Sequence, residues 1–276
     1  MFISGIFSRW SFKVCGGQNS DRICVSPRGN IAAFTHEAGR KTNGDGFFFR
    51  NFPGTVLAVG DGLSGIPAGE IANRISLQTL QRHTRLNTPL PSVFRRANAR
   101  ILKTAARMGK PAKGMSTTLV AARVVKDRAG IASCGDSRIF LIEENEKVSL
   151  LTRDQNDAFD RYQAEYLFEP VVFPMEDPAE YYEMSRKRRN NPLFKCLGMK
   201  DPVIFTLEKD VVLRKGSRLL LCTDGLYRYL PYPSFIEILA RGESPANTVD
   251  KLVKKALANM ASSGDNIAVV LYEYCP

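Results

Sequence analysis

Short apolar runs along the chain alternate with stretches in which apolar residues recur at helical spacing. Apolar runs bounded by turn residues predict strands at residues 30–36, 46–52, 54–61, 116–125, 129–144, 217–227 and 266–274. Apolar positions repeated every three to four residues predict helices at 68–83, 92–109 and 245–261. Strands outnumber helices, and this order is more typical of two packed sheets covered by helices than of a parallel βαβ sheet. We therefore expect an α+β fold.

Two segments depart from this pattern. Residues 1–30 contain Gly16, Gly17, Pro27 and Gly29 with little periodicity, which predicts a loosely structured N-terminal leader. Residues 155–195 mix Pro, acids and aromatic residues with a basic run at 185–191, which predicts an irregular insertion, or flap, outside the core. The rest of the 276-residue chain predicts a single domain over 31–276 that carries this flap and is long enough to bury a large core.

Composition indicates a globular protein with a basic surface. The hydrophobic fraction is 44% and the charged fraction 24%, while the net charge of +11 and the pI near 9.5 favour acidic partners such as phosphoproteins, nucleic acid or an anionic membrane. The basic run at 185–191 has no aromatic stacking platform beside it, so a rim that attracts phosphorylated protein is favoured over a nucleic-acid site. We find neither a signal peptide nor the roughly 18 apolar residues that span a bilayer.

The cysteines and histidines do not form a metal-binding motif. The six cysteines are scattered without a CxxC pair, and the two histidines are His36 and His83, so we expect no zinc site. Cys134 and Cys222 lie in apolar runs and are expected to be buried thiols, which suits a reducing cytoplasm. His36 is expected to make structural hydrogen bonds, and His83 to be exposed at a helix end.

Four acids lie at the ends of apolar runs, each next to a glycine: Asp61, Asp136, Asp224 and Asp265. Glycine permits a sharp turn and a close approach of the backbone to a ligand. A single Asp in such a position is ordinarily a turn residue or a helix cap. Recurrence of the pattern in distant parts of the chain favours a shared site over coincidence.

If these strand ends converge, their carboxylates repel one another. Two carboxylates about 4 Å apart repel by roughly 4 kcal/mol at an effective dielectric constant near 20. A marginally stable fold tolerates several such pairs only if cations neutralise them. Oxygen ligands without Cys or His select hard divalent ions such as Mg²⁺ or Mn²⁺. Two ions that share a carboxylate acidify a bridging water and bind a phosphoryl group, so the pattern predicts metal-assisted hydrolysis.

The motifs around these acids resemble those of the metal-dependent Ser/Thr protein phosphatases of the PPM, or protein phosphatase 2C, type, and especially their compact bacterial members. The resemblance runs from about residue 33 to residue 274. It rests on the order and spacing of THEAGRKTNGDGFF, LAVGDGLSGIPAGEIA, MSTTLVAARV, CGDSRIFLIEENEKVSLLTRDQN, LLLCTDGLYRYL and SSGDNIAVVLY. It implies a four-layer αββα sandwich of two antiparallel sheets flanked by helices, with a binuclear Mn²⁺ or Mg²⁺ centre in a cleft at one end.

The resemblance also implies roles for individual residues. Asp61 would bridge the two metal ions, and Gly62 would contribute its carbonyl oxygen. Asp224 and Asp265 would bind the first ion. Asp45 would lie beside the second ion, through water.

Two further residues complete the implied site. Asp136 matches the acid that helps to hold a weaker third metal ion in bacterial members. Arg40 lies three residues before Asn43, as in the family, and would clamp the substrate phosphate because a guanidinium binds two phosphate oxygens at once. Asp61 and Arg40 are thus the expected catalytic residues.

The sequence departs from the family pattern at two places. The family's Asn-Glu-Asp is Asn43-Gly44-Asp45 here, so an acid near the second metal ion is missing. Leu63 and Ser64 stand where eukaryotic members have a histidine, so no imidazole is available there as a general acid.

We therefore expect a cytoplasmic, monomeric protein serine/threonine phosphatase that uses a metal-bridged hydroxide. Its expected partners are phosphorylated proteins and a cognate Ser/Thr kinase, and no nucleic acid. The alternative is a catalytically impaired regulator of the same fold that binds phosphoproteins, suggested by Gly44 and by Leu63 and Ser64. A third reading, a nucleic-acid-binding protein, rests on net charge alone.

Overall fold

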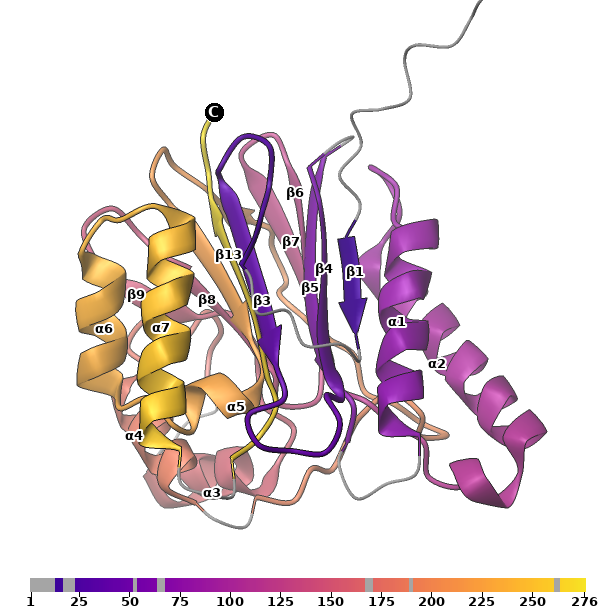
Figure 1. Cartoon of the computed structure of the whole chain (residues 1–276). Coiled ribbons are helices and arrows are strands. Elements are labelled where there is room, and N and C mark those ends of the chain that lie inside the picture. Colours follow the sequence, from indigo (N-terminus) through magenta and orange to yellow (C-terminus); the bar gives the residue numbers. More distant parts are fainter. Residues whose placement is uncertain are drawn as a thin grey trace, which may run out of the picture.

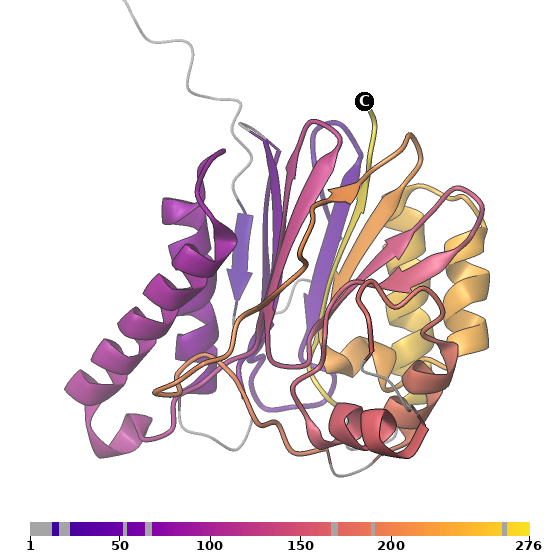
Figure 2. The ribbon, with the colours of Figure 1, turned by 180° about the vertical axis from the view of Figure 1, so that it is seen from behind.

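The computed structural model is a four-layer αββα sandwich, in which two antiparallel sheets pack face to face between two layers of helices (Figures 1 and 2). The predicted fold class is confirmed. The structure describes residues 13–16, 23–51, 54–63, 68–166, 171–188, 191–260 and 264–276.

The first sheet, sheet A, has the strand order β1-β4-β5-β6-β7-β10, and β11 also pairs with β7. Its strands are β1 (Lys13–Gly16), β4 (Asp45–Arg50), β5 (Thr55–Asp61), β6 (Leu119–Val125), β7 (Arg128–Cys134), β10 (Phe205–Thr206) and β11 (Val211–Val212). The second sheet, sheet B, has the order β2-β3-β13-β12-β8-β9. Its strands are β2 (Cys24–Val25), β3 (Ile31–His36), β8 (Arg138–Ile142), β9 (Val148–Leu150), β12 (Arg218–Cys222) and β13 (Ile267–Glu273).

Both faces of the central strands are apolar because each sheet is covered on both sides. In β4, Phe47 and Phe49 pack in the core between the sheets, whereas Phe48 packs in the core under the helices of sheet A. Successive side chains of a strand point to opposite faces, so three consecutive phenylalanines serve two cores. The continuous apolar runs in the sequence reflect this double burial.

Two layers of helices close the sandwich. On sheet A lie α1 (Gly69–His83) and α2 (Leu90–Met108), followed by the short 3₁₀ helix η1 (Lys110–Ala112). On sheet B lie α5 (Asp224–Tyr227), α6 (Tyr232–Ala240) and α7 (Pro245–Asn259). The helices predicted at 68–83, 92–109 and 245–261 correspond to α1, α2 and α7, and the sequence analysis did not predict α5 or α6.

The segment 155–195 also contains two helices that the sequence analysis did not predict, α3 (Asp157–Tyr166) and α4 (Ala179–Lys187). Tyr181 and Tyr182 on α4 are fully buried in the core that covers sheet B. The expectation that this segment lies outside the core therefore does not hold for its two helices. Aromatic rings hold them in place: the ring of Tyr182, for example, lies 5.2 Å from that of Phe235 on α6.

Strands β1 and β2 lie inside the segment 1–30 that was expected to be loosely structured. β1 pairs with β4 at one edge of sheet A, and β2 pairs with β3 at one edge of sheet B. The remainder of the predicted leader includes residues 1–12 and 17–22, which lie outside the described residues. The division into a leader and one domain stays a prediction.

The run 129–144, predicted as one strand, forms two strands in different sheets, β7 in sheet A and β8 in sheet B, joined by a short connection. Gly135 lies in the connection with φ = 110°. A Cβ atom at this position would lie 2.7 Å from the side chain of Thr118. Glycine is therefore required where the chain turns into Asp136.

Candidate metal centre

The pairing of two neighbouring strands brings the first two acids together. Asp45 begins β4 and Asp61 ends β5, and the antiparallel register places these two residues opposite each other. Residues directly opposite on antiparallel strands have Cα atoms about 4.5–5.5 Å apart and point to the same face. Because Asp45 lies two residues before Phe47, both carboxylates are directed toward the space between the sheets.

The Asp45 carboxylate is buried and only partly satisfied. Its Oδ2 atom accepts a hydrogen bond of 2.7 Å from the hydroxyl of Thr223. Its Oδ1 atom accepts none from the residues that the structure describes. Burial raises the pKa of Asp45 to about 8; the Thr223 hydrogen bond opposes this rise, and the charges of Asp224 and Asp265 add to it.

Two threonines from the strand predicted at residues 116–125 position Asp61. The amide of Asp61 donates to the hydroxyl of Thr118 at 3.0 Å, and the carbonyl of Asp61 accepts from the hydroxyl of Thr117 at 2.8 Å. Burial raises the pKa of Asp61 well above its ordinary value, and the neighbouring carboxylates, Asp45 foremost, raise it further. The backbone of this acid is thus fixed while its side chain faces like charges.

Sheet B supplies the next two acids from adjacent strands. Asp224 begins α5 two residues after β12 ends, and Asp265 lies two residues before β13 begins. The pairing of β12 with β13 places Cys222 opposite Val269, so both acids lie at the same end of the sheet. Burial raises the pKa of Asp265 to about 6, and Asp224 is the next largest cause.

Asp136, in the turn between the sheets, is the fifth acid. Its Oδ2 atom accepts a hydrogen bond of 3.0 Å from the Asn156 amide, and its carbonyl accepts one of 3.2 Å from the Tyr227 hydroxyl. Burial raises the pKa of Asp136 to about 7, and the charge of Asp224 contributes next. Asp224 therefore acts electrostatically on all four of the other acids.

A buried ion pair anchors the connection that carries Asp136. The Arg138 side chain is fully buried and donates two hydrogen bonds, of 3.1 and 2.7 Å, to Oδ2 of Asp154. The same Asp154 atom accepts a hydrogen bond of 2.6 Å from Tyr181 on α4. The Arg138 guanidinium also lies 3.7 Å from the ring centroid of Tyr227. The segment expected to be a flap thus contributes, through Tyr181, to the contacts that fix the connection between β7 and β8.

Gly62 and Gly44 lie in close contact beside the first two acids. The amide of Gly62 donates to the carbonyl of Gly44 at 3.2 Å. A Cβ atom on Gly44 would lie only 2.7 Å from the carbonyl oxygen of Gly62, the oxygen expected to be a metal ligand. Gly44, which replaces the glutamate of the family pattern, therefore leaves space for this carbonyl oxygen.

Arg40 lies at the same end of the molecule as the acids. Its Nη2 atom is 3.0 Å from Oδ1 of Asp265, and its Nε atom donates to the carbonyl of Gly264 at 2.8 Å. The side chain is 42% exposed. Arg40 can therefore reach both an acid of the site and a ligand from solvent.

The donor set fits divalent cations in its chemistry. It contains oxygen atoms alone, several carboxylates raise one another's pKa, and Asp45 keeps a buried oxygen with no described donor. Hard cations such as Mg²⁺ and Mn²⁺ relieve this kind of repulsion. Across the described ranges, however, no three His, Cys, Asp or Glu side chains are already gathered around one point. An ion would have to draw the carboxylates together.

Several residues that support the site were not found by sequence reasoning. Asn73 on α1 donates to the carbonyls of Gly44 and Gly60, both at 2.8 Å. Asn266 accepts from the amide of Gly44 at 2.8 Å and donates to the carbonyl of Glu37 at 2.8 Å. The position of Asn266 directly after Asp265 is a usable signal, whereas nothing in the sequence near Asn73 points to strands β4 and β5.

The residues expected to be structural behave accordingly. His36 accepts a hydrogen bond of 2.8 Å at Nδ1 from the amide of Ala38, and Cys134 and Cys222 are fully buried. Leu63 is described, but Ser64 lies outside the described residues. Within the part of the chain that the structure covers, no helix has the length and apolar character needed to cross a membrane.

This sandwich, with acids at one end of its two sheets, matches a known protein family. The protein phosphatase 2C family model matches residues 35–261. The chain therefore belongs to the protein phosphatase 2C family, whose members are hydrolases. The family resemblance inferred from the sequence is confirmed.

Curated relatives of the chain are bacterial phosphatases. It is 29% identical over 231 residues to the serine/threonine phosphatase stp of Listeria welshimeri, with 79% of this chain and 84% of the relative covered. It is 27% identical over 223 residues to the serine/threonine protein phosphatase PstP of Mycobacterium tuberculosis, with 78% of this chain and 40% of the relative covered.

Solved structures of two serine/threonine phosphatases have the same fold. Stp1 from Staphylococcus aureus has a TM-score of 0.72 at 23% identity, with 94% of this chain and 100% of that chain covered. The catalytic domain of PstP in complex with two manganese ions has a TM-score of 0.67 at 23% identity, with 88% of this chain and 96% of that chain covered. At this identity the structures establish the shared fold.

Proposed function

We propose that this protein is a Mn²⁺- or Mg²⁺-dependent protein serine/threonine phosphatase that hydrolyses phosphoserine and phosphothreonine. The observation that carries the proposal is the approach of Asp45 and Asp61 from sheet A to Asp224 and Asp265 from sheet B, close enough that their charges perturb one another. Serine/threonine phosphatase relatives from several bacteria, and manganese in the PstP structure, support it.

The residues of this chain would divide the work as follows. Asp45, Asp61, Asp224 and Asp265 would hold the divalent ions, with Asp136 as an additional weaker ligand and the Gly62 carbonyl as a neutral one. When bound, the ions would supply positive charge to the phosphoryl oxygens and increase the acidity of a nearby water molecule.

Arg40 would bind the substrate phosphate. Its guanidinium is partly exposed and is held by one carboxylate and one carbonyl. A planar guanidinium offers two parallel N–H donors to a phosphate, which places the phosphorus in a fixed position and stabilises charge that develops on its oxygens. The basic surface of the protein would favour the approach of phosphorylated, acidic proteins.

Turnover of p-nitrophenyl phosphate and of a phosphothreonine peptide tests the proposal. Activity should require Mn²⁺ or Mg²⁺, disappear in chelator and fall at least about 100-fold in Asp61→Asn and Asp224→Asn, because each substitution removes a charged ligand. Asp201→Asn is a matched control that removes an exposed carboxylate. Full activity of the Asp61 and Asp224 variants would exclude this function.

The glutamate of the family pattern is absent at position 44, which suggests one alternative, a regulator of the same fold that binds phosphoproteins without hydrolysing them. Calorimetry combined with a phosphate-release assay separates the two functions. A regulator should bind a phosphopeptide in the presence of Mn²⁺ and release no phosphate.

The cellular setting follows from the proposed activity. We propose phosphorylated proteins as substrates, a Ser/Thr kinase as the enzyme that phosphorylates them, and a monomeric, cytoplasmic phosphatase. Size-exclusion chromatography with light scattering tests the monomer, and phosphoproteomics after loss of this protein tests the substrates.

A further inference from the structure

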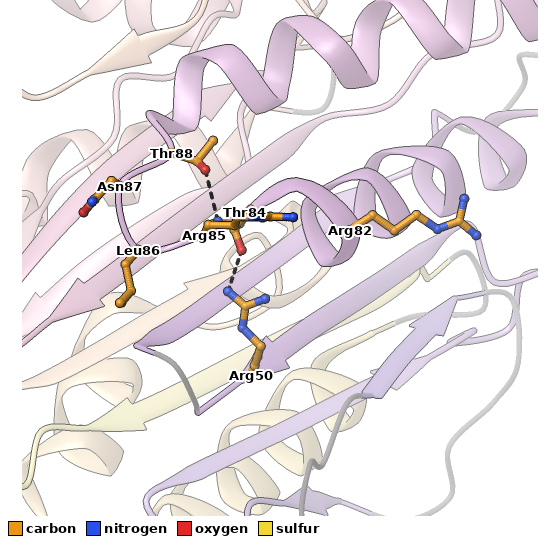
Figure 3. Close-up of a pocket in the computed structure, with 7 residues that line it drawn as sticks. All are labelled: Arg50, Arg82, Thr84, Arg85, Leu86, Asn87 and Thr88. Atoms are coloured by element: carbon orange, nitrogen blue, oxygen red, sulfur yellow. Dashed lines mark hydrogen bonds between the residues drawn. The ribbon is translucent and has the colours of Figure 1, made fainter. Parts of the chain in front are cut away.

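A second candidate site lies at the opposite end of sheet A from the acids. A pocket of about 600 Å³ is formed by the end of β4 and the turn from α1 to α2 (Figure 3). Asp45 begins β4 and Arg50, which lines the pocket, ends it. At about 3.3 Å per residue, five steps along the strand place the two residues roughly 17 Å apart. The pocket is therefore separate from the metal centre.

A buried arginine with incomplete hydrogen bonding contributes to this pocket. The Arg50 residue is 8% exposed, and its Nη2 atom donates to the carbonyl of Thr84 at 2.7 Å (Figure 3). Its Nε atom has no hydrogen-bond partner among the described residues. A buried donor of this kind costs free energy unless a ligand or water accepts its hydrogen bond. Burial also lowers the pKa of Arg50, as expected for a cation with no anion beside it.

The neighbouring side chain shows the same deficiency. Thr84 also lines the pocket, and its buried hydroxyl has no hydrogen-bond partner within the described part of the chain. A hydroxyl can donate to an anion at the same time as a guanidinium does. Arg50 and Thr84 thus each keep one buried donor without a described partner beside the pocket.

Positive charge is concentrated around the pocket. No Asp or Glu occurs in the sequence between Glu70 and Asp127, the stretch that contains α1 and α2. Arg82 and Arg85 also line the pocket and are exposed, and no ion pair joins these arginines to an acid in the ranges that the structure describes. The field of these cations attracts anions.

The pKa of His83 responds to these positive charges. Burial lowers the pKa of His83, and the positive charges of Arg96, Arg100, Arg82 and Arg85 lower it further. The imidazole lies between Arg82 and the pocket residue Thr84 in the sequence. An anion bound among these cations would offset their charge and raise the pKa of His83.

We propose that this pocket binds the phosphate group of a small soluble molecule, either free phosphate or a nucleotide. Arginine is the residue best suited to phosphate oxygens, and the pocket volume is within the range of small-molecule sites. Because Arg50 is buried, a compact ligand that enters the pocket reaches it better than a polymer that lies across the surface. The site does not depend on the proposed phosphatase activity.

Nuclear magnetic resonance of the His83 ring in the full chain, with Mg²⁺ present, tests the proposal. Inorganic phosphate, adenosine diphosphate and sodium chloride at matched ionic strength are titrated separately. Phosphate or adenosine diphosphate should shift the His83 signals to saturation and raise the pKa of His83, and the tighter of the two identifies the ligand class. The chloride control is needed because salt alone screens the arginines and raises the same pKa.

Substitutions at two arginines test whether the ligand binds in this pocket. Arg85→Ala removes an exposed arginine of the pocket without disturbing the core and should weaken binding about tenfold or more. Arg107→Ala removes one exposed positive charge at the far end of α2 and should change binding by less than about twofold. The proposal is overturned if phosphate and adenosine diphosphate act no differently from chloride, if both variants weaken binding equally, or if DNA alone saturates the His83 shift.

Discussion

The guanidinium of Arg40 lies 3.0 Å from the carboxylate of Asp265. Arg40 follows β3 and Asp265 precedes β13, and the pairing of these two strands brings the distant residues together. The residue expected to bind substrate phosphate and a residue expected to bind metal thus share one contact. Arg40 lowers the pKa of Asp265 and partly offsets the effects of burial and of Asp224. The pair therefore couples the charge state of the acids to the residue at the exposed side of the site.

Replacement of Arg40 should impair substrate use more than folding. Arg40→Ala should lower kcat/KM for a phosphothreonine peptide about 10- to 100-fold, since a charge-assisted hydrogen bond is worth about 1.5–3 kcal/mol. Arg40→Lys should recover part of this loss, because it keeps the charge but not the planar pair of donors. Lys41→Ala, which removes an exposed charge at the next residue, is the control. Equal losses in the Arg40 and Lys41 variants would contradict the assignment.

Gly44 should be intolerant of a side chain. A Cβ atom in Gly44→Ala would press on the Gly62 carbonyl oxygen at 2.7 Å, so the backbone beside Asp61 must move. We expect a loss of about 1–3 kcal/mol in the free energy of unfolding, measured in urea. Calorimetric titration should also show weaker Mn²⁺ binding. A variant with unchanged stability and unchanged Mn²⁺ affinity would show that this contact is unimportant.

The metal-free protein should become less stable as the pH rises from about 4 to about 8. Asp45, Asp136 and Asp265 have an ordinary pKa of 3.8, and burial foremost raises these values to about 8, 7 and 6. At pH values between the ordinary pKa of 3.8 and the raised pKa values, the folded state binds more protons than the unfolded state. The free energy of unfolding therefore falls as the pH rises.

Urea unfolding in chelator at a series of pH values measures this dependence. Mn²⁺ should stabilise the protein most near pH 8, where the carboxylates are ionised and repel one another most strongly. A stability that rises between pH 5 and pH 8 in chelator would contradict the clustering of the acids.

The buried pair of Arg138 and Asp154 should be costly to break. Arg138→Met should lower the free energy of unfolding by about 3–5 kcal/mol, because the Asp154 charge is left buried without its partner. The double variant Arg138→Met with Asp154→Leu should lose less than the sum of the single variants. In the exposed pair of Lys254 and Asp250, Lys254→Met should cost less than about 1 kcal/mol. Denaturant unfolding of all four variants measures these losses and tests the prediction.

The sequence allowed prediction of those features that depend on local pattern. Apolar runs located β3, β4, β5 and β13, and the helical repeat located α1 and α7. The acids were found because each lies next to a glycine at the end of a run. The strand register that places Asp45 opposite Asp61, and the pairing of β12 with β13, agree with the expected convergence, although the metal-binding roles of the acids stay predictions.

Features that depend on distant contacts could not be predicted in this way. The helix α4 carries Tyr181 and Tyr182 among charged residues, and its pattern is unclear until sheet B provides the surface that buries these rings. The hydrogen bond from Thr223 to Asp45 joins residues 178 positions apart. Likewise, the partners of Asn73 are set by the packing of α1 on two strands and not by its neighbours in the sequence.

The register of β4 and β5 has a consequence for how this chain can change in length. In this register Asp45 faces Asp61 at one end of the ladder, and Arg50 faces Val56 at the other end. Inserting one residue within either strand would reverse the direction of one carboxylate, since side chains alternate along a strand. Related sequences should therefore accumulate insertions and deletions between residues 51 and 54 rather than within β4 or β5. Changes of length between the strands leave the pairing of Asp45 with Asp61 intact.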